Sequence, residues 1–247
     1  MIRKDFLRTT LLGGISIIVL PQFSFFSIQD MYTREQLIGK ANPDIVGDSY
    51  TSKMHYQAKA AFQEMKNAAS KANIDIEIVS AFRSFDRQKE IFESKYIQFT
   101  QEGLLPIQAI EKIIEYSTIP GTSRHHWGTD IDIIDANAER PEDVLQEEHF
   151  QNNGPFCTLK AWLDEYANSF GFYEVYTNAT TRKGFKYEPW HFSYAPISIP
   201  MLKAYRSLDV KQILLEEKIM GSEYFSDEFI SKYWAENILD INPHLLL

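Results

Sequence analysis

The sequence predicts an α+β fold in which a mainly antiparallel sheet is flanked by helices and followed by a helical C-terminal extension. Residues 52–72 place small and apolar side chains along one side of a helix. Segments in which polar and apolar residues alternate, as in strands with one buried face, cluster later in the chain. Helices that come first and strands that cluster later favour an α+β arrangement.

The elements after the first helix follow one another closely. Residues 74–79 alternate and are expected to form a strand. Asp86 can cap a helix over 86–99. A break at Gly103 separates this helix from a further helix that runs through Tyr116.

Strands predominate after the turn formed by Pro120-Gly121-Thr122. The expected elements are a strand over 129–134, a helix over 157–170, a strand over 172–176, a loop over 177–186, a strand over 190–194, and helices over 203–218 and 226–238. The last two helices form the expected extension over 199–247. We expect it to pack on the domain as a cap, and a wall-binding or partner-binding module is the alternative.

Two short segments carry the residue types of a catalytic zinc site. A catalytic zinc ion takes three protein ligands and leaves a position for water, and a carboxylate that is not a ligand accepts the proton of that water. The sequence offers His125, Asp132 and His191 as ligands and Glu188 as the base.

The expected strands explain how these residues could converge. Asp130 and Asp132 share one face of the 129–134 strand, while the isoleucines between them point into the core. His125 precedes this strand in a loop that Gly128 makes tight. His191 opens the 190–194 strand, so a loop histidine and two strand residues can meet at one metal.

The other histidines call for a structural interpretation. His55, His149 and His244 lie in no motif, and we expect them to be hydrogen-bonded structural residues. His126 adjoins His125, and neighbouring side chains in extended chain point apart, so one of the two should face away from the metal. A calcium loop is excluded because isoleucines occupy its ligand positions, and no HExxH helix is present.

The motif Ser-x-His-x2-Gly-x3-Asp at residues 123–132, followed by Glu-x2-His at 188–191, resembles the zinc D-alanyl-D-alanine carboxypeptidases of the VanY type. These belong with the lysostaphin-type peptidases and the hedgehog signalling domain in the LAS group. The resemblance covers roughly residues 50–195 and implies a hedgehog/DD-peptidase-like fold. It implies the same ligands and the same base.

The resemblance extends to substrate contacts. The family carries Ser-x-x-Arg-Ser upstream, and Ser80-Ala81-Phe82-Arg83-Ser84 is similar to it, with Gln88 following. By resemblance, Arg83 contacts substrate and stabilises the oxyanion. Ser123 and Gln88 are expected to bind substrate. Arg124, like Arg83, offers a cation for a terminal carboxylate.

The function that the resemblance implies is zinc-dependent removal of the C-terminal D-alanine from peptidoglycan stem peptides. A D,D-dipeptidase and an L,D- or D,D-endopeptidase of cell-wall cross-links are the alternatives within the enzyme class. Two others are a zinc-bearing binding protein without hydrolysis and a structural envelope protein without metal. Glu188 argues against a binding protein, because a closed structural zinc site needs no base.

The composition of the chain limits the kinds of partner that it is expected to bind. The chain of 247 residues has a net charge of −9, which argues against nucleic acid. Cys157 is the only cysteine, so neither an internal disulfide nor a thiolate zinc cluster can form. We expect a monomer that meets the membrane only through its N-terminus.

The N-terminus has the composition of an export signal. Arg3, Lys4 and Arg8 precede an apolar run over 11–20, which is short for a membrane-spanning helix. The start resembles a twin-arginine signal with lysine at the second basic position. We therefore expect residues 1–26 to be an export signal or membrane anchor, 27–50 a lead-in and 51–198 the peptidase domain. The expected location is the periplasm or cell envelope.

Overall fold

The computed structural model describes residues 31–246. The expected export segment, residues 1–26, lies outside this range. Within it, no helix is both long enough and apolar enough to cross a membrane.

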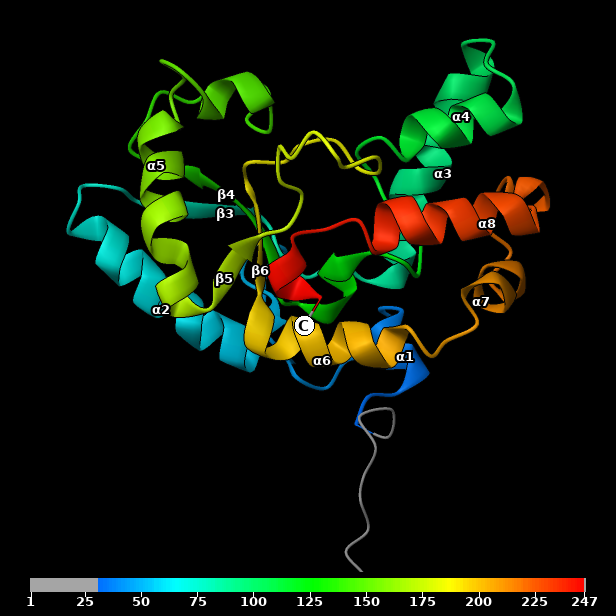
Figure 1. The fold of residues 1–247 in the computed structure, drawn as a ribbon, viewed down its shortest axis with the longest axis horizontal. Coiled ribbons are helices and arrows are strands. Elements are labelled where there is room, and N and C mark those ends of the chain that lie inside the picture. Colours follow the sequence, from blue (N-terminus) through cyan, green and yellow to red (C-terminus); the bar gives the residue numbers. More distant parts are fainter. Residues whose placement is uncertain (1–30, 247) are drawn as a thin grey trace, which may run out of the picture.

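The centre of the fold is an antiparallel sheet, as the sequence predicts. Its four strands lie in the order β3 (Ile76–Ser80), β4 (Asp130–Asp135), β6 (His191–Tyr194) and β5 (Phe172–Glu174). The strands lie near the middle of Figure 1. A second, two-stranded sheet pairs β1 (Ile45–Val46) with β2 (Met54–His55).

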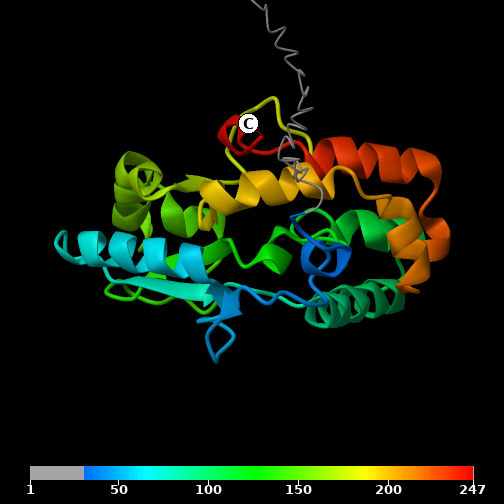
Figure 2. The same ribbon diagram turned by 90° about the horizontal axis from the view of Figure 1, so that it is seen from below.

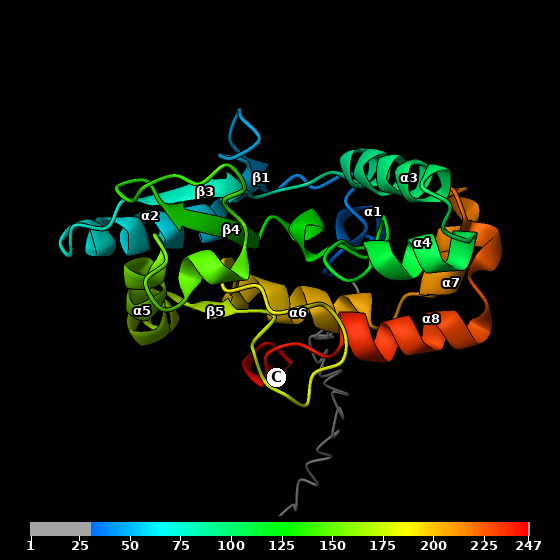
Figure 3. The same cartoon turned by 90° about the horizontal axis from the view of Figure 1, so that it is seen from above.

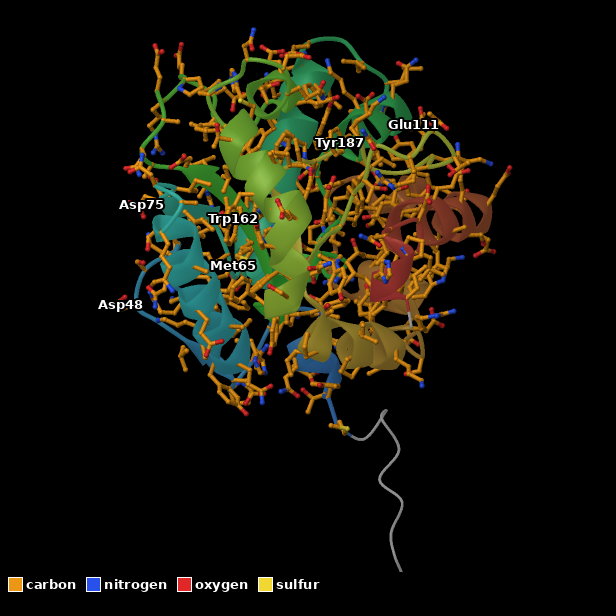
Figure 4. All side chains as sticks on the ribbon, turned by 60° about the vertical axis from the view of Figure 1, so that its left-hand side comes forward. Asp48, Met65, Asp75, Glu111, Trp162 and Tyr187 are labelled. Atoms are coloured by element: carbon orange, nitrogen blue, oxygen red, sulfur yellow. The ribbon has the colours of Figure 1, made fainter. Side chains whose placement is uncertain are left out.

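One face of the sheet is covered by α2 (Tyr56–Ser70) and α5 (Cys157–Tyr166) (Figure 1). Figure 4 shows both helices side by side, with Met65 on the first and Trp162 on the second. Ile131 and Ile133 of β4 are fully buried in the core cluster that these helices share with the sheet. Because side chains alternate along a strand, Asp130 and Asp132 point to the opposite face.

The other side of the molecule is helical. It contains α1 (Arg34–Leu37), α3 (Phe85–Gln101), α4 (Pro106–Ile113), α6 (Ala195–Tyr205), α7 (Val210–Glu216) and α8 (Asp227–Tyr233). Figure 3 shows α3, α4, α7 and α8 grouped beyond the sheet, and Figure 2 shows α6 running along the molecule. Buried residues of all these helices share one hydrophobic cluster. The helices after residue 199 therefore pack on the domain.

Several boundaries differ from those expected. Ser84, not Asp86, caps α3, because its side chain accepts a hydrogen bond from the backbone of Arg87, and the helix begins earlier. The expected helix over 203–218 is divided between α6, which begins directly after β6, and α7. Residues 124–127, expected to be an extended loop, form a 3₁₀ turn that ends at Gly128 with φ 68°.

Candidate metal centre and active site

The structure brings the three expected ligands together. Asp132 on β4 and His191 on β6 are direct neighbours in the antiparallel register. The 3₁₀ turn before β4 places His125 Nε2 3.4 Å from Asp132 Oδ2, and His191 Nδ1 lies 3.7 Å from Asp132 Oδ1. One ligand atom from each residue lies within 4.8 Å of the others, and all three side chains are buried.

The donor set fits a divalent metal ion. Asp132 Oδ1 is buried without a hydrogen-bond partner. Burial raises the pKa of Asp132 to about 6, with His191 acting in the opposite direction. A carboxylate in such a place is costly unless a cation compensates it. Burial also lowers the pKa of His125 well below its ordinary value, which favours the neutral imidazole that binds metals.

The ligand histidines are held from behind. His125 Nδ1 lies 2.8 Å from the carbonyl oxygen of Ala81. His191 Nε2 lies 3.0 Å from Asp130 Oδ2. Such contacts fix the orientation of a metal-binding imidazole and its tautomer. The nitrogens that make these contacts are His125 Nδ1 and His191 Nε2. The other nitrogen of each ring lies near Asp132.

Asp130 is a supporting residue whose role the sequence did not reveal beyond its face on the strand. It accepts hydrogen bonds from Arg124 Nε at 2.8 Å, Ser193 Oγ at 2.6 Å and Thr129 Oγ1 at 2.8 Å. Burial alone would raise its pKa, but Arg124 and His191 hold the pKa of Asp130 below its usual range. Asp130 therefore stays charged and anchors His191. Its partner Ser193 faces it across the register of β4 and β6.

His126 faces away from the ligand set, as expected for one of the two neighbours. Its Nε2 accepts a hydrogen bond from the backbone of Gly121 at 3.1 Å, and its Nδ1 lies 2.6 Å from the carbonyl oxygen of Arg83. Burial lowers the pKa of His126 to about 4. The side chain thus ties two loops together.

Glu188, the expected base, lies beside the ligands. It is 7% exposed, and its Oε2 lies 2.8 Å from His191 Nδ1. Its backbone N–H donates to Tyr176, which fixes the approach to β6. Burial alone would lower the pKa of His191, but its contacts with Asp130 and Glu188 raise that pKa to about 10. Binding of a metal at Nδ1 would therefore release a proton.

The side chain of Arg83 is held in place by hydrogen bonds to its neighbours. Its Nη1 donates to Gln88 Oε1 at 2.7 Å, its Nη2 donates to Ser80 Oγ at 3.0 Å, and its Nε is buried without a partner. Gln88 is fully buried and donates to the carbonyl oxygen of Thr118. The structure thus gives Gln88 the task of orienting Arg83, and its contact with substrate stays a prediction.

Ser123 and Arg124 offer donors to the cavity. Ser123 Oγ and Arg124 Nη1 are both buried without a hydrogen-bond partner. The remaining nitrogens of Arg124 are engaged, since Nε donates to Asp130 and Nη2 donates to Ser193. These free donors suit a ligand with acceptor oxygens.

The site opens into a cavity of about 610 Å³, a size that suits a small peptide. The ligands, Glu188, Arg83, Ser123 and Arg124 all line it. Further lining residues, which the sequence had not singled out, are Ile91, Lys95, Tyr116, Ser117, Thr118, Asp143, Leu145, Gln146, Glu147, Glu148, Tyr176, Phe185 and Trp190.

An antiparallel α+β fold with a buried His-Asp-His donor set beside a glutamate and an arginine is the arrangement of a metallopeptidase. Comparison with known families agrees. The chain belongs to the VanY family of D-alanyl-D-alanine carboxypeptidases, whose family model matches residues 51–197.

Individual relatives are more distant. A D-alanyl-D-alanine carboxypeptidase of Enterococcus faecalis is 27% identical over 157 residues, which cover 63% of this chain and 53% of the relative. The putative carboxypeptidase YodJ of Bacillus subtilis is 28% identical over 141 residues, covering 56% of this chain and 45% of YodJ. The chain thus spans about half the length of these curated relatives.

Solved structures share the fold. The structure of VanYB in complex with D-alanine-D-alanine has a TM-score of 0.51 at 23% identity, covering 72% of this chain and 92% of that chain. The LD-carboxypeptidase LdcB has a TM-score of 0.50 at 24% identity, covering 68% of this chain and 75% of that chain. The fold class predicted from the sequence is confirmed.

Proposed function

We propose that the protein is a zinc-dependent D-alanyl-D-alanine carboxypeptidase that removes the terminal D-alanine from peptidoglycan stem peptides. The observation that carries the proposal is the convergence of His125, Asp132 and His191 beside Glu188. Membership of the VanY family supports the substrate class. A structural neighbour, a VanY mutant, was solved in complex with Zn(II), which supports zinc as the metal.

The chain's own residues have distinct tasks in hydrolysis. When bound by the three ligands, zinc would supply an acidified water and polarise the peptide carbonyl. Glu188 accepts the proton of the attacking water as the new C–O bond forms. As the C–N bond breaks, Glu188 returns that proton to the leaving amine of D-alanine. Its burial beside His191 keeps the carboxylate close to this reaction.

Arg83 and the 123–124 turn are proposed to hold the substrate's oxygens. The guanidinium of Arg83, fixed by Gln88 and Ser80, stabilises the oxyanion that develops on the scissile carbonyl. Ser123 Oγ and Arg124 Nη1 bind the terminal carboxylate, because both are donors that lack a protein partner. A free terminal carboxylate is what distinguishes an exopeptidase substrate.

We further propose that the protein is exported to the cell envelope. Its substrate lies outside the cytoplasmic membrane, and the basic start and apolar run at residues 3–20 have the composition of an export signal. Fractionation of cells that carry the Arg3 and Lys4 double substitution tests the route. A twin-arginine signal should fail, whereas a general secretory signal that retains Arg8 should be only weakened.

Mass analysis of the products from a muropeptide ending in D-Ala-D-Ala tests the activity. Loss of a single D-alanine is expected from purified protein with zinc. Release of the dipeptide or opening of a cross-link would point instead to the dipeptidase or endopeptidase alternatives. Glu188→Ala is the control, and full hydrolysis by that variant would overturn its assignment as the base.

A further inference from the structure

The cavity contains one cation that the proposed mechanism does not use. Lys95 on α3 is half-buried and lines the cavity with Arg83 and Glu188. Within residues 31–246 its ammonium group has no hydrogen-bond or ion-pair partner. Lys89, on the same helix, is different, because its Nζ donates to the carbonyl oxygen of Glu217 at 3.0 Å and lies 3.9 Å from Glu93.

Helix α3 aims this cation at the same wall of the cavity as Arg83. Gln88, Ile91 and Lys95 are spaced three and four residues apart, so they lie along one side of the helix. Gln88 holds Arg83 at one end of this stripe, while Ile91 and Lys95 line the cavity. Lys95 thus continues the wall that Arg83 begins.

No direct ion pair within residues 31–246 compensates the charge of Lys95. Burial and the nearby guanidinium of Arg83 lower the pKa of Lys95, and the carboxylate of Glu188 opposes them. Asp143, Glu147 and Glu148 also line the cavity, but none of them forms an ion pair with Lys95 within residues 31–246. Asp143 accepts from Gln146, and Glu147 accepts from Gln151. An ammonium that is partly removed from water without a partner is costly, and an anionic group of a ligand would offset that cost.

The donors proposed for the terminal carboxylate come from a different element. Ser123 and Arg124 lie on the turn before β4, whereas Lys95 lies on α3 on the side of Arg83. The terminal carboxylate therefore already has its own donors. Lys95, the remaining cation, is therefore available to bind a second anionic group of the substrate.

We propose that Lys95 binds a carboxylate that branches from the substrate peptide on the acyl side of the scissile bond. Lys95 then determines specificity, since peptides with a free carboxylate in this position are preferred over peptides in which it is a carboxamide. The proposal rests on the proposed function, because it assumes that a peptide occupies the cavity.

Two pentapeptides ending in D-alanyl-D-alanine test this. They differ in one upstream residue, a γ-linked D-glutamate whose α-carboxylate is free in one and amidated in the other. The wild-type protein should prefer the free acid. In Lys95→Gln the ratio of kcat/KM for acid over amide should fall by roughly tenfold or more, the size of a charge-assisted contact, chiefly through KM. Lys95→Arg should retain part of the preference.

Lys89→Gln is the matched control, since it removes a lysine from the same helix outside the cavity, and it should keep the wild-type ratio. An equal loss on both peptides in Lys95→Gln would overturn the proposal and leave Lys95 a structural residue. A changed preference for a free over an amidated C-terminus would overturn it in favour of the terminal carboxylate.

Failure of the proposed function itself has a separate signature. In that case wild-type protein hydrolyses neither peptide. Calorimetric titration of both peptides into wild-type and Lys95→Gln protein then measures the contact without turnover. The contact is supported if wild-type protein binds the acid more tightly than the amide and Lys95→Gln protein does not. The same ratio of acid to amide affinity in both proteins would overturn it.

Discussion

Asp132 and His191 reach the metal centre directly from neighbouring strands, whereas the hydroxyls of Tyr205 on α6 and Tyr233 on α8, two residues that lie beyond the family-matched residues 51–197, contact only the loop that leads to it. Tyr205 Oη donates to the carbonyl oxygen of Gly121 at 2.8 Å, and Tyr233 Oη accepts from the backbone N–H of Ile119 at 3.1 Å. The sheet supplies donor atoms. The C-terminal helices hold the loop that precedes these donor atoms in the chain.

This support continues toward the site through His126. The same loop donates from the backbone of Gly121 to His126, whose other nitrogen contacts the carbonyl oxygen of Arg83. Tyr233 Oη also lies 2.8 Å from Thr122 Oγ1, one residue before Ser123. The C-terminal helices thus belong to the architecture of the cavity, which does not favour an independent wall-binding module.

Loss of a ligand on the sheet side should have the largest effect. His125→Ala, Asp132→Ala and His191→Ala should each strip zinc and abolish hydrolysis, because a site with two ligands no longer defines the geometry. Metal analysis of purified protein measures this. His126→Ala is the control and should keep zinc near one per chain. Zinc lost from His126→Ala but retained by His125→Ala would mean that the wrong histidine has been assigned.

Arg83→Ala should have the second-largest effect. Loss of one oxyanion contact lowers kcat by roughly a hundredfold to a thousandfold. Zinc content should not change, because Arg83 contacts none of the ligand side chains through a hydrogen bond. Arg83→Lys should not restore the full rate, since lysine lacks the planar fork that Gln88 and Ser80 hold. Near-normal turnover in Arg83→Ala would make Arg83 a structural residue.

Asp130→Asn should weaken zinc binding by roughly tenfold to a hundredfold, as expected for a residue that orients a metal ligand. Competition with a chelator of known affinity measures the change. Asp135→Asn is the matched control, because Asp135 lies on the same strand, is also buried, and bonds the backbone of Asp75 instead of a ligand. Equal zinc affinity in the wild type and Asp130→Asn would limit Asp130 to pairing with Arg124.

The sequence predicted the sheet side in more detail than the helical side, for physical reasons. Residue type and strand alternation are enough to place Asp132 on one face, and the VanY-type motif names its partners. The role of Asp130 depends on the register between β4 and β6, which no local pattern encodes. The hydroxyl contacts of Tyr205 and Tyr233 join residues more than eighty positions from their partners, so they arise only once the helices pack.

Tyr233→Phe should have the smallest effect, and it tests the helical side alone. Removal of the hydroxyl leaves the buried N–H of Ile119 without its acceptor, at a cost of about 1–3 kcal/mol in the free energy of unfolding. For a chain of this size each kcal/mol lowers Tm by roughly 2–4 °C. Because Ser123 and His126 adjoin the loosened loop, kcat/KM should fall by roughly two- to tenfold while zinc stays bound. Tyr224→Phe, at an exposed position on the same side, is the control and should change neither quantity. A lower Tm with unchanged kcat/KM would show that the C-terminal helices stabilise the fold without positioning the cavity loop.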